Sequence, residues 1–415
     1  MKLSRYVILV EENNEHTILF NSVSGVLLRA PSGILKQTTD REAVFPLERR
    51  NFVIPEDFDE QEFFLNQYEK HANRGGRELA FTIAPGTACN YKCRYCFEKD
   101  AEILKMSETD VKELADFIKQ TALHTKNLKT ISIKWFGGEP LLYYPQIISL
   151  SEGINDFCDK NGLEFRTRFI SNGSLLTEEI IDSISKYNVV SFQITLDGME
   201  KESCFYKGSD VQEYRHVISI IKSFCTKIRF NIRLNIGPEN FSSVLSLVKN
   251  LYEDPLLKEH ISLYISPIES DEVPSFDEAG YTKAFLDFYE YLYNLGWYRV
   301  IREAIPGQYK TPCYTLHEQQ YLIDPKNRII SCENLIGKDD GVMGEISDSF
   351  ESVAKKKNSI RSRFENSIPQ ECKNCSFFPV CFTGCPEKRR TPEQCEEFQK
   401  RTVGILKIIS RTKNG

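Results

Sequence analysis

The stretch CNYKCRYC, residues 89–96, decides how the rest of the chain is interpreted. It follows an apolar run at residues 79–84 whose composition is typical of a β-strand. Three thiolates at C-x₃-C-x₂-C spacing can ligate three irons of one [4Fe–4S] cluster and leave the fourth iron open. The alternatives are a zinc site with a distant fourth ligand, or three unrelated buried cysteines. Structural zinc sites prefer paired C-x₂-C units that supply four ligands, so the spacing favours the cluster.

Strand-like and helix-like stretches alternate from residue 79 to about residue 266. The predicted strands are residues 79–84, 131–135, 165–170, 189–196, 228–235 and 261–265, and the predicted helices are residues 108–122, 147–157, 178–185, 214–224 and 242–252. A repeated βα pattern implies a parallel sheet, and six units predict an α/β fold with a partial (β/α)₆ TIM-like barrel. Catalytic groups of such folds lie at the C-terminal ends of the strands, which is where the three thiols fall.

The chain is predicted to contain three domains: a small N-terminal α+β module at 1–75, the partial barrel at 76–300, and a cysteine-rich domain at 301–415. The module combines strand-like runs at 6–10, 17–20 and 26–28 with a turn at 12–14, a helix-compatible stretch at 58–71 and a linker at 71–77. A further helix is expected at 275–295 and a closing helix after Cys395.

The motif at the end of the first strand resembles that of the radical S-adenosylmethionine (SAM) superfamily, C-x₃-C-x-aromatic-C. The resemblance implies that Cys89, Cys93 and Cys96 hold a cluster whose open iron chelates the methionine part of SAM. One electron then cleaves the cofactor, and the 5′-deoxyadenosyl radical abstracts a substrate hydrogen. Tyr95 occupies the aromatic position, which in the family lies near the adenine.

The second predicted strand ends in WFGGEP, residues 135–140, which matches the GGEP motif of this family. Gly137 and Gly138 allow close backbone approach to a ligand, and the Glu139 carboxylate can accept from an ammonium group. The resemblance assigns the loop to the methionine amino group. Taken alone, the same letters could form an ordinary tight turn.

Two later loops also fit the resemblance. Ser171 and Asn172 end the third strand and resemble the ribose-binding segment, and Asp197 ends the fourth. Some relatives have an arginine nine residues after the glycine that follows this aspartate, where the chain has Lys207. A lysine cannot form the same bidentate pair with a carboxylate, so this assignment does not carry over directly.

Seven cysteines near the C-terminus resemble the SPASM extension of the superfamily, which carries two auxiliary [4Fe–4S] clusters and would bring the total to three. The resemblance assigns Cys372, Cys375, Cys381 and Cys395 to one auxiliary cluster and Cys313, Cys332 and Cys385 to the other. The fourth site of the latter cluster is open, bound to substrate or filled by another group such as His317. A zinc ribbon is the alternative for this region.

One residue departs from the SPASM pattern: Asn327 stands where the family usually has glycine. Because asparagine tolerates left-handed backbone geometry, the turn is expected to survive.

Composition limits the function and the location. The chain has 415 residues and a formal net charge of -6, which disfavours nucleic acid as a partner. No apolar run is long enough to span a membrane, and the N-terminus lacks a signal-peptide pattern, so we expect a cytoplasmic protein. Because the cytosol keeps thiols reduced, the 13 cysteines favour metal ligation over disulfides.

SPASM enzymes mostly modify peptides and proteins, and the N-terminal module resembles those of peptide-maturing members. Such modules often bind a precursor's leader by adding it as a strand, although this one could simply cap the barrel. We therefore predict an enzyme that modifies a ribosomally made precursor peptide by oxidative thioether or C–C crosslinking. The expected electron donor is a flavodoxin or ferredoxin, and the oligomeric state is left open.

Two other functions compete with peptide crosslinking. Glu333 follows Cys332 where sulfatase-maturing relatives carry an aspartate, and a carboxylate there could act as a general base. This keeps formylglycine formation in a sulfatase as the enzymatic alternative. The alternative of another class is a zinc-binding scaffold without catalysis.

Overall fold

The computed structural model describes residues 1–12, 14–34, 41–72, 77–99, 101–307, 313–348 and 350–412. The chain divides into two compact units. The first contains residues 1–72, 277–316 and 361–415, and the second contains residues 73–276 and 317–360.

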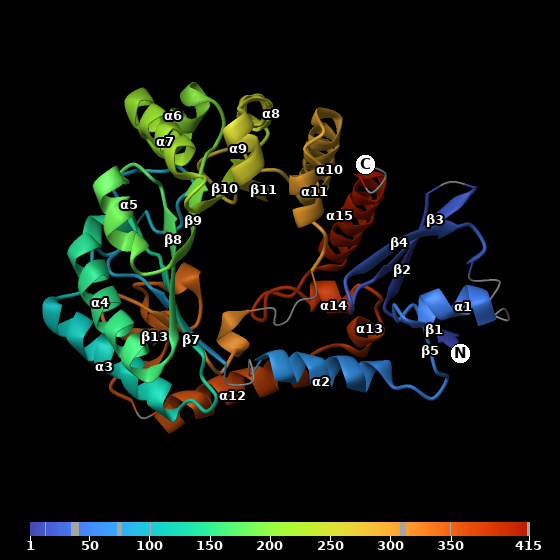
Figure 1. The fold of residues 1–415 in the computed structure, drawn as a ribbon, viewed down its shortest axis with the longest axis horizontal. Helices are drawn as coiled ribbons and strands as arrows, with labels where there is room; N and C mark the ends of the chain where they lie inside the picture. Colours follow the sequence, from blue (N-terminus) through green and yellow to red (C-terminus); the bar gives the residue numbers. More distant parts are fainter. Residues whose placement is uncertain are drawn as a thin grey trace. The chain divides into compact units, whose positions relative to one another are not determined.

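A parallel sheet forms the centre of the second unit (Figure 1). Its strands are β6 (Glu78–Ile83), β7 (Thr130–Trp135), β8 (Glu164–Ser171), β9 (Val189–Thr195), β10 (Arg229–Ile236) and β11 (Ser262–Pro267). Neighbours pair in the order β11-β10-β9-β8-β7-β6, all in parallel. The α/β class and the six predicted strands are confirmed.

Helices cover one face of this sheet (Figure 1). They are α3 (Glu108–His124), α4 (Tyr144–Asn161), α5 (Glu178–Ser185), α6 (Glu200–Lys207), α7 (Val211–Phe224), α8 (Phe241–Glu253) and α9 (Pro255–His260), with the 3₁₀ helix η3 (Pro140–Tyr143) before α4. Capping boxes at Ser107 and Asp210 begin α3 and α7, and Gly162 ends α4 in a left-handed conformation. The predicted helices are present, whereas α6 and α9 were not predicted.

The sheet continues past β6 with three strands from the later part of the chain. The strand β12 (Gln320–Ile323) pairs in parallel with β6, and β13 (Arg328–Ile330) and β14 (Val342–Glu345) follow in antiparallel order. Asn327, in the turn between β12 and β13, has φ 57°. The expectation that asparagine would preserve this left-handed turn is confirmed. The 3₁₀ helices η5 (Glu333–Leu335) and η6 (Asp339–Gly341) precede β14, and α12 (Phe350–Asn366) follows it.

The first unit contains the predicted N-terminal hairpin. Strands β2 (Val7–Glu11), β3 (His16–Asn21) and β4 (Val26–Pro31) form an antiparallel sheet, and β1 (Lys2–Leu3) pairs with β5 (Val53–Ile54). Two helices, α1 (Arg41–Glu48) and α2 (Glu60–Ala72), accompany them. The predicted turn at 12–14 includes residue 13, and the predicted linker at 71–77 includes residues 73–76, all of which lie outside the described residues.

Later segments complete the first unit. They are α10 (Glu278–Leu295), α11 (Tyr298–Glu303), η4 (Tyr314–Leu316), α13 (Gln370–Lys373), α14 (Phe378–Cys381) and α15 (Pro392–Arg411). The closing helix α15 begins before Cys395, not after it, because Thr391 forms a capping box with Gln394 and Pro392 occupies the first turn. It packs on α10 and contacts β3 and β4. Within the described residues, no helix combines the length and apolarity that crossing a bilayer requires.

Aromatic side chains join the N-terminal hairpin to the C-terminal cysteine segment inside the first unit. Phe64 of α2 lies 5.6 Å from the Tyr6 ring and 5.5 Å from the Phe378 ring, centroid to centroid. The Tyr68 ring packs against the Phe382 ring in a tilted arrangement, with the centroids 4.5 Å apart. The Tyr6 hydroxyl also donates to the Lys373 carbonyl, at 3.2 Å. The two ends of the chain therefore share one apolar core.

Candidate active site

The first cysteine loop leaves the C-terminal end of β6 and is held in place by α6. The backbone N–H of Lys92 donates to the Lys207 carbonyl at 3.1 Å, and that of Arg94 donates to the Tyr206 carbonyl at 2.9 Å. Cys89 is exposed, while Cys93 and Cys96 are partly buried. All three predicted thiols thus lie on one loop at the edge of the sheet where barrel enzymes hold catalytic groups.

These thiols are in an environment that opposes their ionisation. Burial raises the pKa of Cys93 to about 12, and it also raises the pKa values of Cys89 and Cys96. The negative charge of each neighbouring thiolate adds to the shift of Cys93, while Lys207 opposes it. Metal ligation requires thiolates, so a bound cation would offset the cost of ionising these partly buried thiols. The three residues fit a ligand set for a cationic cluster.

The glycine loop after β7 packs against the start of the cysteine loop. A Cβ atom at Gly138 would lie 2.2 Å from the Ala88 carbonyl oxygen and 2.4 Å from that of Thr87. Gly137 has φ 105°, a conformation that side chains disfavour, and the Glu139 N–H donates to the Ala88 carbonyl at 2.9 Å. Both glycines are therefore required for the contact between the two loops.

Glu139 joins this loop to the end of β8. Its carboxylate is fully buried and accepts hydrogen bonds from Leu141 N at 3.0 Å, Ser171 Oγ at 2.9 Å and Asn172 N at 2.8 Å. Burial raises the pKa of Glu139, and these three hydrogen bonds oppose the shift. Asn172 Nδ2 also donates to Asn90 Oδ1 at 2.9 Å, which links it to the cysteine loop. The structure thus brings Glu139, Ser171 and Asn172 together.

Asp197 ends β9 and is also fully buried. The Tyr95 hydroxyl donates to Asp197 Oδ2, so the predicted adenine-side tyrosine and this aspartate are in contact. Burial raises the pKa of Asp197, and Lys207 is the strongest opposing influence. Asn240, which was not predicted, donates from Nδ2 to the backbone carbonyls of Asp197 at 2.8 Å and Asn235 at 2.9 Å. It joins the loops that follow β9 and β10.

Lys207 is a buried cation close to Cys93, Glu139 and Asp197. It is only 5% exposed, at the end of α6, and its Nζ lies 5.7 Å from the centroid of the Tyr91 ring. Burial raises the pKa values of Cys93, Glu139 and Asp197, and the positive charge of Lys207 opposes each of these shifts. The sequence left its role open because the family position is an arginine; the structure buries it among the predicted site residues.

Glu333 lies beside β7. Its carboxylate pairs with Lys134 Nζ at 2.5 Å, with the Glu333 side chain 26% exposed. Glu98, which the sequence did not single out, is close by: burial raises its pKa to about 7, the Glu333 charge adds to the shift and Lys338 opposes it. The only sequence signal for Glu98 was its position two residues after Cys96.

Four C-terminal cysteines line one cavity of about 290 Å³ in the first unit. They are the predicted set Cys372, Cys375, Cys381 and Cys395, with Arg389 and Arg390 among the other lining residues. Directly after Cys381, Phe382 has φ 47° and Thr383 has φ 64°. Left-handed geometry is unfavourable for such residues and is often found where a loop is shaped for a ligand.

The other predicted set is distributed over both units. Cys313 and Cys385 belong to the first unit and Cys332 to the second, and their joint ligation of a cluster stays a prediction. His317 is 6% exposed and belongs to the second unit. In the described parts of the chain, no three His, Cys, Asp or Glu side chains converge closely enough to hold a single metal ion.

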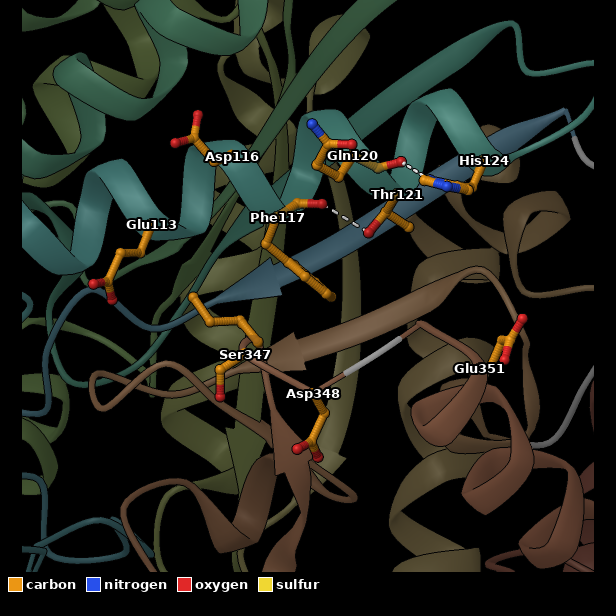
Figure 2. Close-up of a pocket in the computed structure, with 10 residues that line it drawn as sticks. Glu113, Asp116, Phe117, Gln120, Thr121, His124, Ser347, Asp348 and Glu351 are labelled. Carbon is orange, nitrogen blue, oxygen red and sulfur yellow. Dashed lines mark hydrogen bonds between the residues drawn. The ribbon is translucent and has the colours of Figure 1, made fainter.

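A larger cavity, of about 670 Å³, has no predicted site residue in its lining. It lies in the second unit, between α3 and a segment that contributes Ile346, Ser347, Asp348 and Glu351 (Figure 2). Its acidic side chains are Glu113, Asp116, Asp348 and Glu351. Thr121 Oγ1 donates to the Phe117 carbonyl at 2.7 Å, so one lining hydroxyl is used within the helix itself. Cavity size alone therefore does not identify the active site.

Comparison with known proteins places this geometry in a family. The family model described as the radical SAM superfamily matches residues 83–251. The chain is 22% identical to the radical SAM cyclopropyl synthase TigE of Paramaledivibacter caminithermalis, over 92% of this chain and 89% of TigE. It is also 22% identical to a cysteine-type anaerobic sulfatase-maturating enzyme of Clostridium novyi, over 81% of this chain and 98% of that protein.

Solved structures share the fold. The native anSMEcpe structure with bound AdoMet and Cp18Cys peptide has a TM-score of 0.64 at 18% identity, covering 81% of this chain and 99% of that one. Streptococcus suis SuiB bound to precursor peptide SuiA has a TM-score of 0.54 at 15% identity, covering 94% and 99%. Together with the three-cysteine loop, the glycine loop and the buried carboxylates at one edge of the sheet, these matches show that residues 83–251 form a radical SAM domain.

Proposed function

We propose that this chain is a radical SAM/SPASM peptide maturase. It reductively cleaves S-adenosylmethionine and modifies a ribosomally made precursor peptide, by an oxidative thioether or carbon–carbon crosslink. The observation that carries the proposal is the meeting of three loops at one sheet edge: the thiols of residues 89–96, the carboxylate of Glu139 and the Tyr95–Asp197 pair.

Each residue of this edge has an assigned task. Cys89, Cys93 and Cys96 would hold a [4Fe–4S] cluster, and the loop of Gly137 and Gly138 would bind the methionine part of the cofactor. When bound, the cluster and S-adenosylmethionine supply one-electron cleavage of a carbon–sulfur bond and abstraction of a substrate hydrogen.

The remaining site residues orient the cofactor. Ser171 and Asn172, fixed by Glu139, would hold the ribose, and Tyr95 would lie on the adenine side. Lys207, buried beside Asp197, balances the charge of the cofactor carboxylate without the bidentate geometry that an arginine would give.

Two auxiliary [4Fe–4S] clusters complete the cofactor set of the proposal. Cys372, Cys375, Cys381 and Cys395 hold one around their shared cavity, supported by the two arginines of its lining. Cys313, Cys332 and Cys385 hold the other. A flavodoxin- or ferredoxin-type protein supplies the electrons.

A peptide substrate is supported by two observations. Relatives of similar length include TigE and a sulfatase-maturating enzyme, and one structural neighbour is bound to a precursor peptide. In addition, β2 and β4 are the edge strands of the described N-terminal sheet, and an extended leader can add to such an edge through backbone hydrogen bonds.

Formylglycine formation is the second candidate, favoured by Glu333. Its half-buried carboxylate beside Lys134 could accept the proton released as a substrate radical is oxidised. A neighbouring sulfatase gene would favour this reaction, whereas a neighbouring short open reading frame rich in Cys, Ser or aromatic residues favours crosslinking.

The test is anaerobic reconstitution of the full chain, followed by reduction with S-adenosylmethionine and the peptide encoded beside its gene. We expect 5′-deoxyadenosine and a peptide lighter by two hydrogens. Bound zinc and no iron or sulfide would instead support the scaffold alternative. Fully loaded protein that forms no 5′-deoxyadenosine with its peptide contradicts the proposal.

A further inference from the structure

The strands of the central sheet have two chemically different faces. One face carries apolar, buried side chains, such as Ile133, Phe169 and Ile232. The opposite face, here called the polar face, carries five cations on three strands: Lys134, Arg166, Arg168, Arg229 and Arg233. Register pairs Lys134 with Arg168 and Arg229 with Ser191, and Ser191 with Arg168, so these residues share a face.

Two of these cations are neutralised by carboxylates. Arg166 binds Glu164 through two hydrogen bonds, Nε to Oε1 at 2.7 Å and Nη2 to Oε2 at 2.6 Å. Lys134 pairs with Glu333. The charge of these two residues is therefore balanced within the chain.

Arg168 differs from them. It is half-buried, and among the described residues it has no ion pair and no hydrogen-bond partner for its guanidinium group. It also lies directly across from Lys134 in the β7–β8 register, and like charges at such positions destabilise a sheet. A partly desolvated cation next to a second cation is unfavourable unless an anion binds there.

The path from Arg168 to the active site is also positive. Arg233 donates only to neutral groups, from Nε to Asn235 Oδ1 at 2.9 Å and from Nη2 to Ser266 Oγ at 3.0 Å. Arg168 precedes Ser171 by three residues, which at about 3.3 Å per strand residue is roughly 10 Å. An anion bound at Arg168 would therefore lie within a few peptide residues of the cofactor loops.

We propose that Arg168 binds the side-chain carboxylate of an aspartate or glutamate in the substrate peptide, close to the residue that is modified. This rests on the proposed function, because it names the substrate chemistry of the same site. The guanidinium group binds a carboxylate through two parallel hydrogen bonds, which fixes both position and orientation. Lys134 is held by Glu333 and does not compete for the same carboxylate.

The first test measures binding without turnover. The reconstituted full chain, loaded with S-adenosylmethionine, captures peptides from a pool of random mRNA-displayed dodecapeptides, which have no free C-terminus. We expect the captured pool to be enriched in Asp and Glu, and Arg168→Gln to lose that enrichment. Arg166→Gln is the matched control, since it lies on the same strand and face but is paired with Glu164, and it should keep the enrichment.

The second test uses the precursor peptide. Arg168→Gln should raise KM about 10- to 100-fold with little change in kcat, the effect of losing one charge-assisted contact. Replacing one acidic residue of the peptide by its amide should produce the same change, and combining the two substitutions should add little more.

The outcomes separate this proposal from the proposed function. Absence of 5′-deoxyadenosine with the precursor would refute the function, while the displayed pool still reports on Arg168. Equal acidic content in the pools captured by wild type and Arg168→Gln would refute the carboxylate site. A tenfold weaker affinity for S-adenosylmethionine in Arg168→Gln would assign the residue to the cofactor, which would also overturn the proposal.

Discussion

At the scale of single residues, the glycine loop and the cysteine loop depend on each other. Gly138 has no room for a methyl group, because the carbonyl oxygens of Thr87 and Ala88 lie within 2.4 Å of where it would stand. We expect Gly138→Ala to displace the loop that carries Cys89, to lower the iron content and to reduce the free energy of unfolding by about 2–4 kcal/mol. Iron analysis and urea denaturation measure both effects.

Gly153 provides the matched control for that substitution. It lies inside α4, and nothing is within 4 Å of an added Cβ atom. Gly153→Ala should therefore stabilise the protein, by up to about 1 kcal/mol, and leave its iron content unchanged. Equal iron content in the two variants would show that the close contact of Gly138 with the Thr87 and Ala88 carbonyls does not support the cluster.

Lys207 is the second residue whose role can be separated from its neighbours. Lys207→Met removes the buried positive charge beside Asp197, so we expect affinity for S-adenosylmethionine to fall about 10- to 100-fold. Lys207→Arg keeps the charge and should retain most of the affinity. Calorimetry on anaerobic protein of equal iron content measures this, and equal affinities for the Met and Arg variants would contradict it.

Residue identity predicted much of the site, but not how deeply its members are buried. The spacing of Cys89, Cys93 and Cys96 and the letters GGEP pointed to the correct loops because each motif follows a strand. Lys207 was left open because the family position is an arginine, and the sequence does not reveal that the structure buries this lysine. The sequence did not single out Arg168, because it occupies an ordinary alternating position of a strand. Its position opposite Lys134 depends on the strand register, which the sequence does not show.

At the scale of elements, the aromatic contacts of α2 tie the hairpin to the second cysteine group. Phe64→Ala removes the ring that contacts both Tyr6 and Phe378, and we expect a loss of about 3–5 kcal/mol in the stability of this unit. Because Phe378 adjoins the cavity lined by Cys375 and Cys381, iron content should fall as well. Denaturation and iron analysis test both.

Phe63 serves as the control for this substitution. It is the neighbouring residue of α2, is 41% exposed and contacts Phe58. Phe63→Ala should change stability by less than about 1 kcal/mol. If Phe64→Ala keeps as much iron as Phe63→Ala, the aromatic core does not support the cysteine loop.

The junction of α8 and α9 provides a pH-dependent test. Asp254 caps α9 by accepting from the backbone N–H groups of Leu256 and Leu257, and it pairs with Lys222 at 2.5 Å. The hydrogen bond from Lys222 is the main reason that the pKa of Asp254 lies below its usual 3.8. A carboxyl whose folded pKa is depressed stabilises the fold above the unfolded pKa, and this contribution disappears as the pH falls through the folded value.

Asp254→Asn keeps the capping oxygen and removes the charge. At pH 7 we expect a loss of stability below about 1 kcal/mol, since Lys222 is largely exposed and solvent screens the pair. The difference from wild type should shrink as the pH falls below about 3.8. Asp254→Ala, which also loses the cap, should cost about 1–2 kcal/mol at pH 7. Urea titrations at several pH values measure these free energies of unfolding. If the difference between Asp254→Asn and wild type does not change with pH, the ion pair does not contribute to stability.

Some elements were predictable and others were not. The six parallel strands were predictable because β6 to β11 alternate regularly with amphipathic stretches. The addition of β12 to the same sheet was not predictable. This strand has only four residues, and its partner β6 lies more than 200 residues earlier in the chain. The short α6, which carries Lys207, lacks a side-chain cap at its N-terminus and so gave little local signal.

At the scale of the whole molecule, the sequence suggested three consecutive domains, whereas compactness groups the chain into two units. The first unit draws on the N-terminus, on residues 277–316 and on the last 55 or so residues. Periodicity along a sequence cannot reveal this, because it reports neighbours within about one element. The long-range hydrogen bond from Ser22 Oγ to the Ser376 carbonyl, at 2.7 Å, illustrates such a connection.

The shared core of Tyr6, Phe64 and Phe378 has a consequence for biosynthesis. Tyr6 and Phe64 emerge from the ribosome early, yet Phe378, against which Phe64 packs, is encoded about 300 codons later. At roughly 5–20 residues per second, translation leaves the nascent N-terminus without its packing partners for some 15–60 s. During that interval the exposed face of Phe64 is available to chaperones, and premature termination of the message would release a polypeptide in which Phe64 lacks its C-terminal partner Phe378.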